Sequence, residues 1–168
     1  VMASPIVERD LPLIAKAMPH VAHVAVRNRG TFGGSIALAD PAAEIPACVV
    51  ALGATLVVQS VDGRRDIAAD DYFKGLYETE RRANEILIEV LIPIEQPGTV
   101  SVFMELARRH GDFAIVSAAA LLTAGTDGRI TRASLAVGGA GPAPFRIADA
   151  EARLVGQPGS PEIFEAAA

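Results

Sequence analysis

The sequence predicts an α+β fold, in which antiparallel strands joined by hairpins are followed by separate helices. Three observations lead to this class. Two Asp-Gly pairs, at 62–63 and 127–128, each separate two aliphatic segments and are typical of hairpin turns. The strands around the second pair form a meander that a helical segment follows. A helix-spaced apolar segment precedes the first strands.

The first half is expected to combine two helices with a small sheet. Pro5–Ala17 carries apolar side chains at helical spacing, and Pro19 ends it. Ala37–Ala54 has the composition of a buried helix, with Asp40 as N-cap and Gly53 at its C-terminus. The strands predicted in this half are 23–26, 55–61, 64–67 and 85–92.

The second half is predicted to be a meander and a helix. Residues 93–99 contain Pro and Gly and separate two regimes of composition, which places a domain boundary near Gly98. The predicted domains are therefore 1–97 and 98–168. The elements expected after the boundary are strands at 100–108, 115–123 and 130–137 and a helix at 147–154.

Composition narrows the class of protein. The chain has 168 residues, 51% of them hydrophobic, which favours a folded globule over disorder. A formal net charge of −5 without a basic stripe argues against nucleic-acid binding. The apolar runs are too short to span a membrane, and no export signal opens the chain, so a cytoplasmic location is the default expectation. The start at Val1, as though in mid-domain, suggests a fragment of a longer polypeptide.

The sequence offers few residues for catalysis. The single cysteine, Cys48, rules out an internal disulfide or an iron–sulfur site within the chain, and its apolar surroundings predict a buried, inert thiol. His20, His23 and His110 are expected in surface or capping positions. No nucleophile elbow, zinc-protease or Walker motif is present, so no catalytic residue is predicted. Any redox or group-transfer chemistry must come from a bound cofactor.

A glycine-rich run at 27–35, Arg-Asn-Arg-Gly-Thr-Phe-Gly-Gly-Ser, is the strongest local signal. Glycines let backbone N–H groups approach a ligand closely, and successive free N–H groups bind anions. Arg27 and Arg29 either neutralise a phosphate or lie solvated at the end of a strand. Taken alone, the run is equally compatible with a tight turn and with a nest for a phosphate-bearing ligand.

The run and its surroundings resemble a known family. Together with Ala-Asp-Pro-Ala-Ala-Glu-Ile-Pro at 39–46, the run is similar to the second FAD motif of the medium, FAD-binding subunits of molybdenum hydroxylases, of the carbon monoxide dehydrogenase and xanthine dehydrogenase type. Segments at 71–79, 84–90, 107–114 and 137–144 fit the same family in the same order. The resemblance therefore covers nearly the whole chain.

The resemblance implies both a fold and a function. Residues 1–97 would be the second subdomain of an FAD-binding domain of the PCMH/VAO type, and 98–168 the start of a C-terminal domain with a three-stranded antiparallel sheet and helices. The implied function is electron transfer through FAD to an external acceptor. In the family, a large molybdopterin-binding subunit oxidises the substrate and a small subunit relays electrons through two [2Fe–2S] clusters. A dimer of heterotrimers is the implied assembly.

The resemblance also assigns residues. Gly33 and Gly34 would allow close backbone approach to the cofactor. Glu44 would reach its polar chain, where a carboxylate accepts well from ribose or ribityl hydroxyls. Leu87 would lie against the flavin and Val21 near the other end. The remaining cofactor residues implied are the two hydroxyls and the aromatic ring of the run, Thr31, Ser35 and Phe32, and Asp40, for which helix capping is an equal alternative.

Two departures from the family pattern limit what this chain is expected to do alone. The family's first FAD motif, of the Ala-Gly-Gly type, has no match here, and Met104-Glu105 stands where some relatives have a lysine. Weak or no flavin affinity is therefore expected for residues 1–168 in isolation. The alternative function is a cofactor-free docking domain in a multi-subunit complex. A generic nucleotide-binding module is a third, weaker reading of the glycine run.

Overall fold

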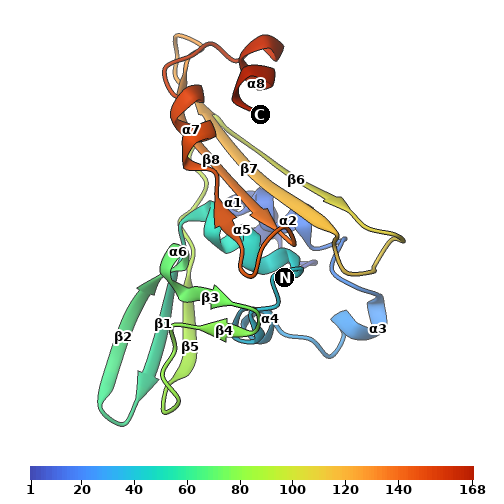
Figure 1. The fold of residues 1–168 in the computed structure, drawn as a ribbon, viewed down its shortest axis with the longest axis vertical. Coiled ribbons are helices and arrows are strands. Elements are labelled where there is room, and N and C mark those ends of the chain that lie inside the picture. Colours follow the sequence, from blue (N-terminus) through green and yellow to red (C-terminus); the bar gives the residue numbers. More distant parts are fainter.

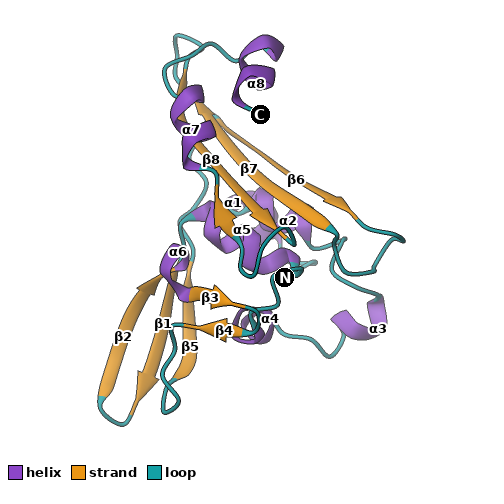
Figure 2. Ribbon diagram, viewed as in Figure 1, coloured by secondary structure: helices purple, strands orange, loops and turns teal.

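The computed structural model describes residues 1–168 and contains two main antiparallel sheets with helices between and around them (Figure 1). The first sheet has the order β2-β1-β5 and the second the order β6-β7-β8-β9. In the ribbon view the first sheet lies below and the second runs diagonally above it, with helix α5 between them (Figure 2). The α+β class predicted from the sequence is therefore present.

The N-terminal region differs from the prediction in two places. The single helix expected over Pro5–Ala17 is two short helices, α1 (Pro5–Asp10) and α2 (Pro12–Ala17), because Pro12 cannot continue the hydrogen-bond ladder of α1. The strand expected at 23–26 is instead a helical turn, α3 (Val24–Arg27). A short alternation of Val and Ala fits either period, and no neighbouring strand is available to pair with it.

The glycine run joins two helices rather than two strands: it begins at the end of α3, turns over residues 28–31 and ends inside the next helix. Thr31 caps α4 (Phe32–Leu38), and the three glycines of the run all keep negative φ. The sequence predicted Asp40 as the N-cap of the next helix, but the structure has Ala43 in that position. Helix α5 (Glu44–Leu52) begins after Ala43, and it ends at Gly53, whose φ of +67° is a left-handed C-cap that glycine adopts without strain.

The first sheet joins a hairpin to a later strand. β1 (Thr55–Ser60) pairs with β2 (Gly63–Ala68) across the predicted Asp-Gly turn, and on its other side with β5 (Ile86–Leu91). A helical turn, α6 (Ala69–Tyr72), and a small hairpin connect β2 to β5. The hairpin strands are β3 (Phe73–Gly75) and β4 (Glu78–Thr79).

The second sheet is built from three long strands and a short fourth one. They are β6 (Thr99–Leu106), β7 (Val116–Ala124), β8 (Ile130–Gly138) and β9 (Phe145–Arg146). The sequence predicted the three long strands but not the two-residue β9. Helices α7 (Ala148–Leu154) and α8 (Pro161–Ala167) follow it.

Helix α5 is the centre of the core. All nine of its residues are buried, and it packs against β7 and β8 on one side and α2 and α4 on the other. Ser134 of β8 donates a hydrogen bond from its hydroxyl to the Ala51 carbonyl oxygen at 2.5 Å. Because strand side chains alternate between faces, Ala133 and Leu135 point the other way, toward α7 and α8. The N-terminus of α5 is thus held rigidly beside α4.

Candidate cofactor site

The beginning of α4 presents backbone N–H groups to open space. The Thr31 hydroxyl oxygen accepts a hydrogen bond from the Gly34 N–H at 2.9 Å, and Ser35 N–H donates to the Thr31 carbonyl at 3.1 Å. The N–H groups of Phe32 and Gly33 therefore have no acceptor in the protein, as is usual in the first turn of a helix. These two donors are free for a ligand.

The two adjacent glycines differ in what a side chain would meet. A Cβ at Gly34 would lie 2.7 Å from the Thr31 hydroxyl oxygen, so only glycine permits the helix cap. A Cβ at Gly33 would meet no atom within 4 Å. Gly33 is thus not required by the packing of this chain, and its bare backbone faces a hollow.

A hollow of about 800 Å³ lies along α4 and the first turn of α5. This volume is within the range of small-molecule sites. The predicted cofactor residues that line it are Val21, Thr31, Phe32, Gly34, Ser35, Asp40 and Glu44. The structure therefore brings seven of the nine residues together around one cavity, although they come from four separate segments of the chain.

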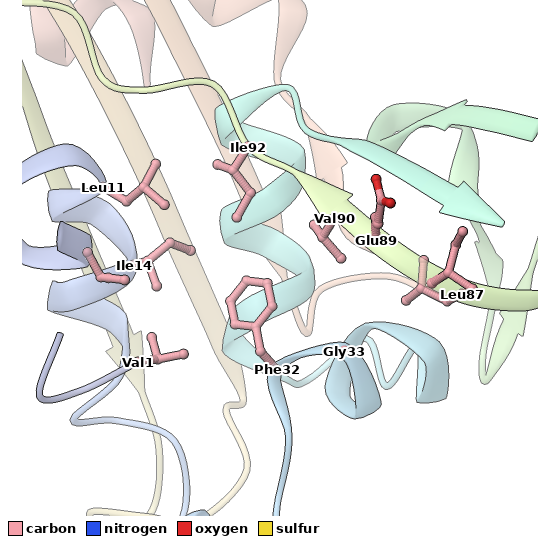
Figure 3. Close-up of a pocket in the computed structure, with 11 residues that line it drawn as sticks. Val1, Leu11, Ile14, Phe32, Gly33, Leu87, Glu89, Val90 and Ile92 are labelled. Carbon is pink, nitrogen blue, oxygen red and sulfur yellow. The ribbon is translucent and has the colours of Figure 1, made fainter.

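The other two predicted residues, Gly33 and Leu87, line a second, largely apolar hollow of about 410 Å³ (Figure 3). It lies between α4, the strand β5 and the N-terminal helices, and Leu11 and Ile14 form its far side. The Phe32 ring borders both hollows. All nine predicted residues consequently surround two neighbouring hollows that meet at Phe32.

Glu44 is the most unusual side chain of the site. It is only 6% exposed, and the hydrogen bond that its carboxylate accepts comes from its own backbone N–H, with no lysine or arginine in an ion pair with it. Burial raises the pKa of Glu44 to about 7, and the nearby carboxyls of Glu105 and Asp40 act in the same direction. One backbone N–H does not use all the acceptor sites of a carboxylate, so Glu44 can still accept from a hydrogen-bond donor that enters the hollow.

Asp40 is held in place by two contacts. One carboxylate oxygen accepts from the Ala42 N–H at 2.9 Å, and the other accepts from the Tyr77 hydroxyl at 3.4 Å. Tyr77 lies at the tip of the β3–β4 hairpin with a φ of +57°, a strained value for a residue with a side chain. Sequence reasoning missed Tyr77, because a positive φ at tyrosine leaves no compositional signal.

The arginines of the glycine run do not form a phosphate clamp. The Arg27 guanidinium donates to the carbonyl oxygens of Val21 and Ala22, at 2.6 and 2.5 Å, and so fixes the wall of the larger hollow. Arg29 is exposed and lines neither hollow. The interpretation of both as solvated strand-end residues is wrong for Arg27, since no strand forms there and its side chain is tied to the backbone.

A loop from the second half also reaches the larger hollow. Gly111, Asp112 and Phe113 line it, and the His23 ring packs against Gly111, which has a φ of +85°. Sequence reasoning used this segment for the resemblance but assigned it no role. A signal was present in Gly111, since an isolated glycine in a polar turn often marks a left-handed backbone.

The remaining chemistry of the chain is sparse. Cys48 is fully buried in α5, and burial raises the pKa of its thiol, as expected for an inert cysteine. No group of three or more His, Cys, Asp and Glu side chains is arranged to hold a metal ion. None of the helices combines the length and the apolar character needed to cross a membrane.

Comparison with known families matches both halves of the chain. Residues 1–95 match the family described as the FAD binding domain in molybdopterin dehydrogenase. Residues 101–168 match the CO dehydrogenase flavoprotein C-terminal domain. The chain belongs to the FAD-binding medium subunits of molybdenum hydroxylases.

Individual medium subunits and their structures agree with this membership. The nicotine 6-hydroxylase medium subunit of Paenarthrobacter nicotinovorans is 45% identical over 99% of the chain. Carbon monoxide dehydrogenase from Hydrogenophaga pseudoflava superposes with a TM-score of 0.94 at 36% identity, and quinoline 2-oxidoreductase from Pseudomonas putida 86 with 0.90 at 41%, each over 99% of the chain.

The chain covers only part of the length of these relatives. The chain spans 58% of the nicotine 6-hydroxylase subunit and 57% of each of the two matched structures.

Proposed function

We propose that this chain forms one wall of the FAD site of a molybdenum hydroxylase medium subunit, and that the subunit passes electrons from the [2Fe–2S] clusters of a partner through FAD to an external acceptor. The observation that carries the proposal is the convergence on two adjoining hollows of free backbone donors at α4 and of Glu44, a buried carboxyl group with no cationic partner. Membership in a family defined by an FAD-binding domain supports the choice of ligand.

The residues present fit FAD in three respects. The free N–H groups of Phe32 and Gly33 suit an anion such as the pyrophosphate. The unpaired carboxyl group of Glu44 suits a ribose or ribityl hydroxyl, which has a proton to donate. The apolar wall around Leu87 and Phe32 suits an aromatic ring system.

In the proposed mechanism, the protein binds and orients the cofactor. Thr31 holds the first turn of α4 so that its N–H groups point outward, and Gly33 allows the cofactor to approach them. Glu44 and Asp40 would hold the polar chain of FAD, Leu87 would pack against the flavin, and Val21 would pack near the other end. FAD, when bound, supplies the two-electron and one-electron chemistry.

We propose further that the chain comprises two units, 1–97 as the second subdomain of a PCMH/VAO-type FAD-binding domain and 98–168 as part of the C-terminal domain. The separate family matches to 1–95 and 101–168 support this division. The proposed partners are a molybdopterin-binding large subunit and a [2Fe–2S] small subunit in a dimer of heterotrimers. Substrate oxidation is assigned to the large subunit.

Copurification tests the proposal. It uses the full chain, by which we mean the complete medium subunit to which the proposal assigns residues 1–168, together with the proposed partner subunits. Flavin absorbance together with molybdenum and iron in one complex is the expected result. An apoprotein that assembles only with itself would contradict the proposal and favour a cofactor-free docking domain. Titration of residues 1–168 alone with FAD is expected to show weak or no binding, because one wall of a site gives few contacts.

A further inference from the structure

A loop of the second sheet borders the larger hollow. It connects β6 to β7, and the Ile115 N–H donates to the Leu106 carbonyl oxygen at 2.8 Å where the two strands part. Gly111, Asp112 and Phe113 of this loop line the hollow, and Phe113 is 72% exposed. An exposed aromatic ring beside a cavity has a large apolar face available for a ligand.

The segment before α3, which lines the same hollow, has a strained backbone that Arg27 holds. Ala22 has a φ of +41°, a value that a residue with a side chain rarely adopts. Two successive carbonyl oxygens, those of Val21 and Ala22, accept hydrogen bonds from the same Arg27 Nη1 atom. A strained residue persists where its surroundings determine its position, and hydrogen bonds from a charged donor are strong. The Ala22 carbonyl group is therefore fixed in place.

The loop rests on this segment at Gly111. A Cβ at Gly111 would lie 2.7 Å from two atoms of the His23 ring and 3.2 Å from the Ala22 carbonyl oxygen. The His23 residue is exposed and its ring can rotate away, but the Ala22 carbonyl is tied to Arg27. A side chain at position 111 would therefore displace the loop and not the segment beneath it.

A second contact joins the same two parts of the chain. The His110 ring of the loop meets the His20 ring edge-on, with 6.4 Å between the ring centroids. The loop thus touches the first half of the chain on both sides of the peptide bond between His110 and Gly111.

We infer that the β6–β7 loop is part of the cofactor site, and that Gly111 and Arg27 are positioning residues that act through Phe113. Arg27 fixes the segment on which the loop rests, and Gly111 lets the loop lie close enough for the Phe113 ring to pack on the bound cofactor. This inference rests on the proposed function, since it takes FAD as the occupant of the hollow. The region that matches the C-terminal domain family would then complete a site whose other walls lie in the FAD binding domain.

Tryptic digestion of the full chain without cofactor tests how the loop is held. Trypsin cleaves after the exposed Arg108 and Arg109 of the loop, and mass spectrometry identifies these cuts. Gly111→Ala should speed this cleavage by about 5-fold or more, because a displaced loop opens more often. The matched control Gly128→Ala changes a glycine of similar φ, +78°, where a Cβ would meet no atom within 4 Å, and should leave the rate unchanged. Equal cleavage rates in Gly111→Ala and Gly128→Ala would overturn the inference.

FAD binding by the full chain provides the second readout. Bound FAD should slow cleavage of the loop, because the cofactor then covers it. Affinity for FAD should fall by about 10-fold in Gly111→Ala and in Phe113→Ala, since each removes the packing of the ring on the cofactor. Gly128→Ala should bind FAD like the unmodified protein. Unchanged FAD affinity in Phe113→Ala, or a loop that FAD does not protect, would overturn the inference.

A variant on the other side of the contact covers the case in which Gly111→Ala does not fold. Arg27→Met should also speed cleavage of the loop and weaken FAD binding, and Arg27→Lys, which keeps a charged donor, should restore part of the affinity. The matched control is Arg29→Met, at an exposed arginine that lines neither hollow. Identical behaviour of Arg27→Met and Arg29→Met in both assays would overturn the inference. Failure of the unmodified full chain to bind FAD would instead remove the proposed function, and the digestion without cofactor still decides whether Gly111 holds the loop.

Discussion

Glu85 and Glu44 are equally buried, at 6% exposed, yet their surroundings are opposite. Glu85, just before β5, accepts two hydrogen bonds from the Arg65 guanidinium, at 3.0 and 2.7 Å, and one from the Arg82 N–H at 2.7 Å. Arg65 is the main cause that lowers the pKa of Glu85 to about 2. Glu44 has no such partners, and burial raises its pKa to about 7.

We interpret Glu85 as a structural carboxylate and propose that Glu44 is a ligand-binding one. Both carboxylate oxygens of Glu85 accept hydrogen bonds from Arg65 or Arg82, so this carboxylate is satisfied within the protein. At Glu44 the protein leaves a costly group beside a hollow and beside free N–H donors. Such an arrangement persists when the surrounding core is rigid, and α5 is entirely buried. The region around Glu44 is therefore where we propose that a ligand binds.

The largest expected effect separates two neighbouring glycines. Gly33→Val should leave the unliganded protein within about 0.5 kcal/mol of its original stability, because its Cβ meets open space, yet reduce FAD affinity by about 100-fold. Gly34→Val should lose the Thr31 cap and about 1–2 kcal/mol of stability. Chemical unfolding and FAD titration of the full chain measure both. Equal effects of the two variants on stability would break the distinction between the open and the packed side of α4.

Substitution of Glu85 should change the stability of the protein without changing its FAD affinity. Glu85→Gln removes charge-assisted hydrogen bonds to Arg65 and is expected to lower the melting temperature by roughly 5 °C at pH 7. Because the folded pKa of Glu85 is depressed, its contribution is present above the unfolded pKa and disappears as the pH falls toward about 2. The gap between variant and parent should close over that acidic range. Unaltered FAD affinity per folded molecule is the accompanying control.

The contribution of Glu44 to stability should depend on pH in the opposite way to that of Glu85. The folded pKa of Glu44 is raised, so its stabilising effect is present below the unfolded pKa and is lost as the pH rises to about 7. Glu44→Gln removes the cost of ionising a buried group and should gain about 1–2 kcal/mol of stability at pH 8, with no gain at pH 4. Urea unfolding of the unliganded protein at the two pH values measures this. A loss of stability at pH 8 would mean that Glu44 has a partner.

The regions around Glu85 and Glu44 also differ in how much of their structure could be predicted from the sequence. The hairpin at Asp62-Gly63 and the strands around it were predicted because their turn chemistry is local. The prediction that Glu44 contacts a cofactor came only from the family resemblance. Its physical basis, the start of α5 at Glu44 instead of a helix from Ala37, depends on tertiary packing of α4 against α5. Local rules do not encode such packing.

Other features of the site lay beyond sequence reasoning for the same reason. The strained Tyr77 reaches Asp40 from the tip of the β3–β4 hairpin. The Gly111 loop meets the hollow through its contact with His23. Each contact joins residues far apart in the chain, so no spacing or composition signal marks it. By contrast, the sequence did offer free backbone N–H groups in the glycine run as one of its two alternatives. The structure has such groups at Phe32 and Gly33, where they belong to the first turn of a helix.

FAD titration of the full chain and of its Glu44→Ala variant, followed by flavin fluorescence at pH 8, tests the central claim most directly. The claim predicts stoichiometric binding by the unmodified full chain, in contrast to residues 1–168 alone, and an affinity lower by about 10-fold or more in the variant, because a hydrogen bond to an ionised acceptor is lost. Glu162→Ala, an exposed change on α8, should bind like the parent. Equal FAD affinity in Glu44→Ala and the parent would contradict the claim that Glu44 forms part of the cofactor wall.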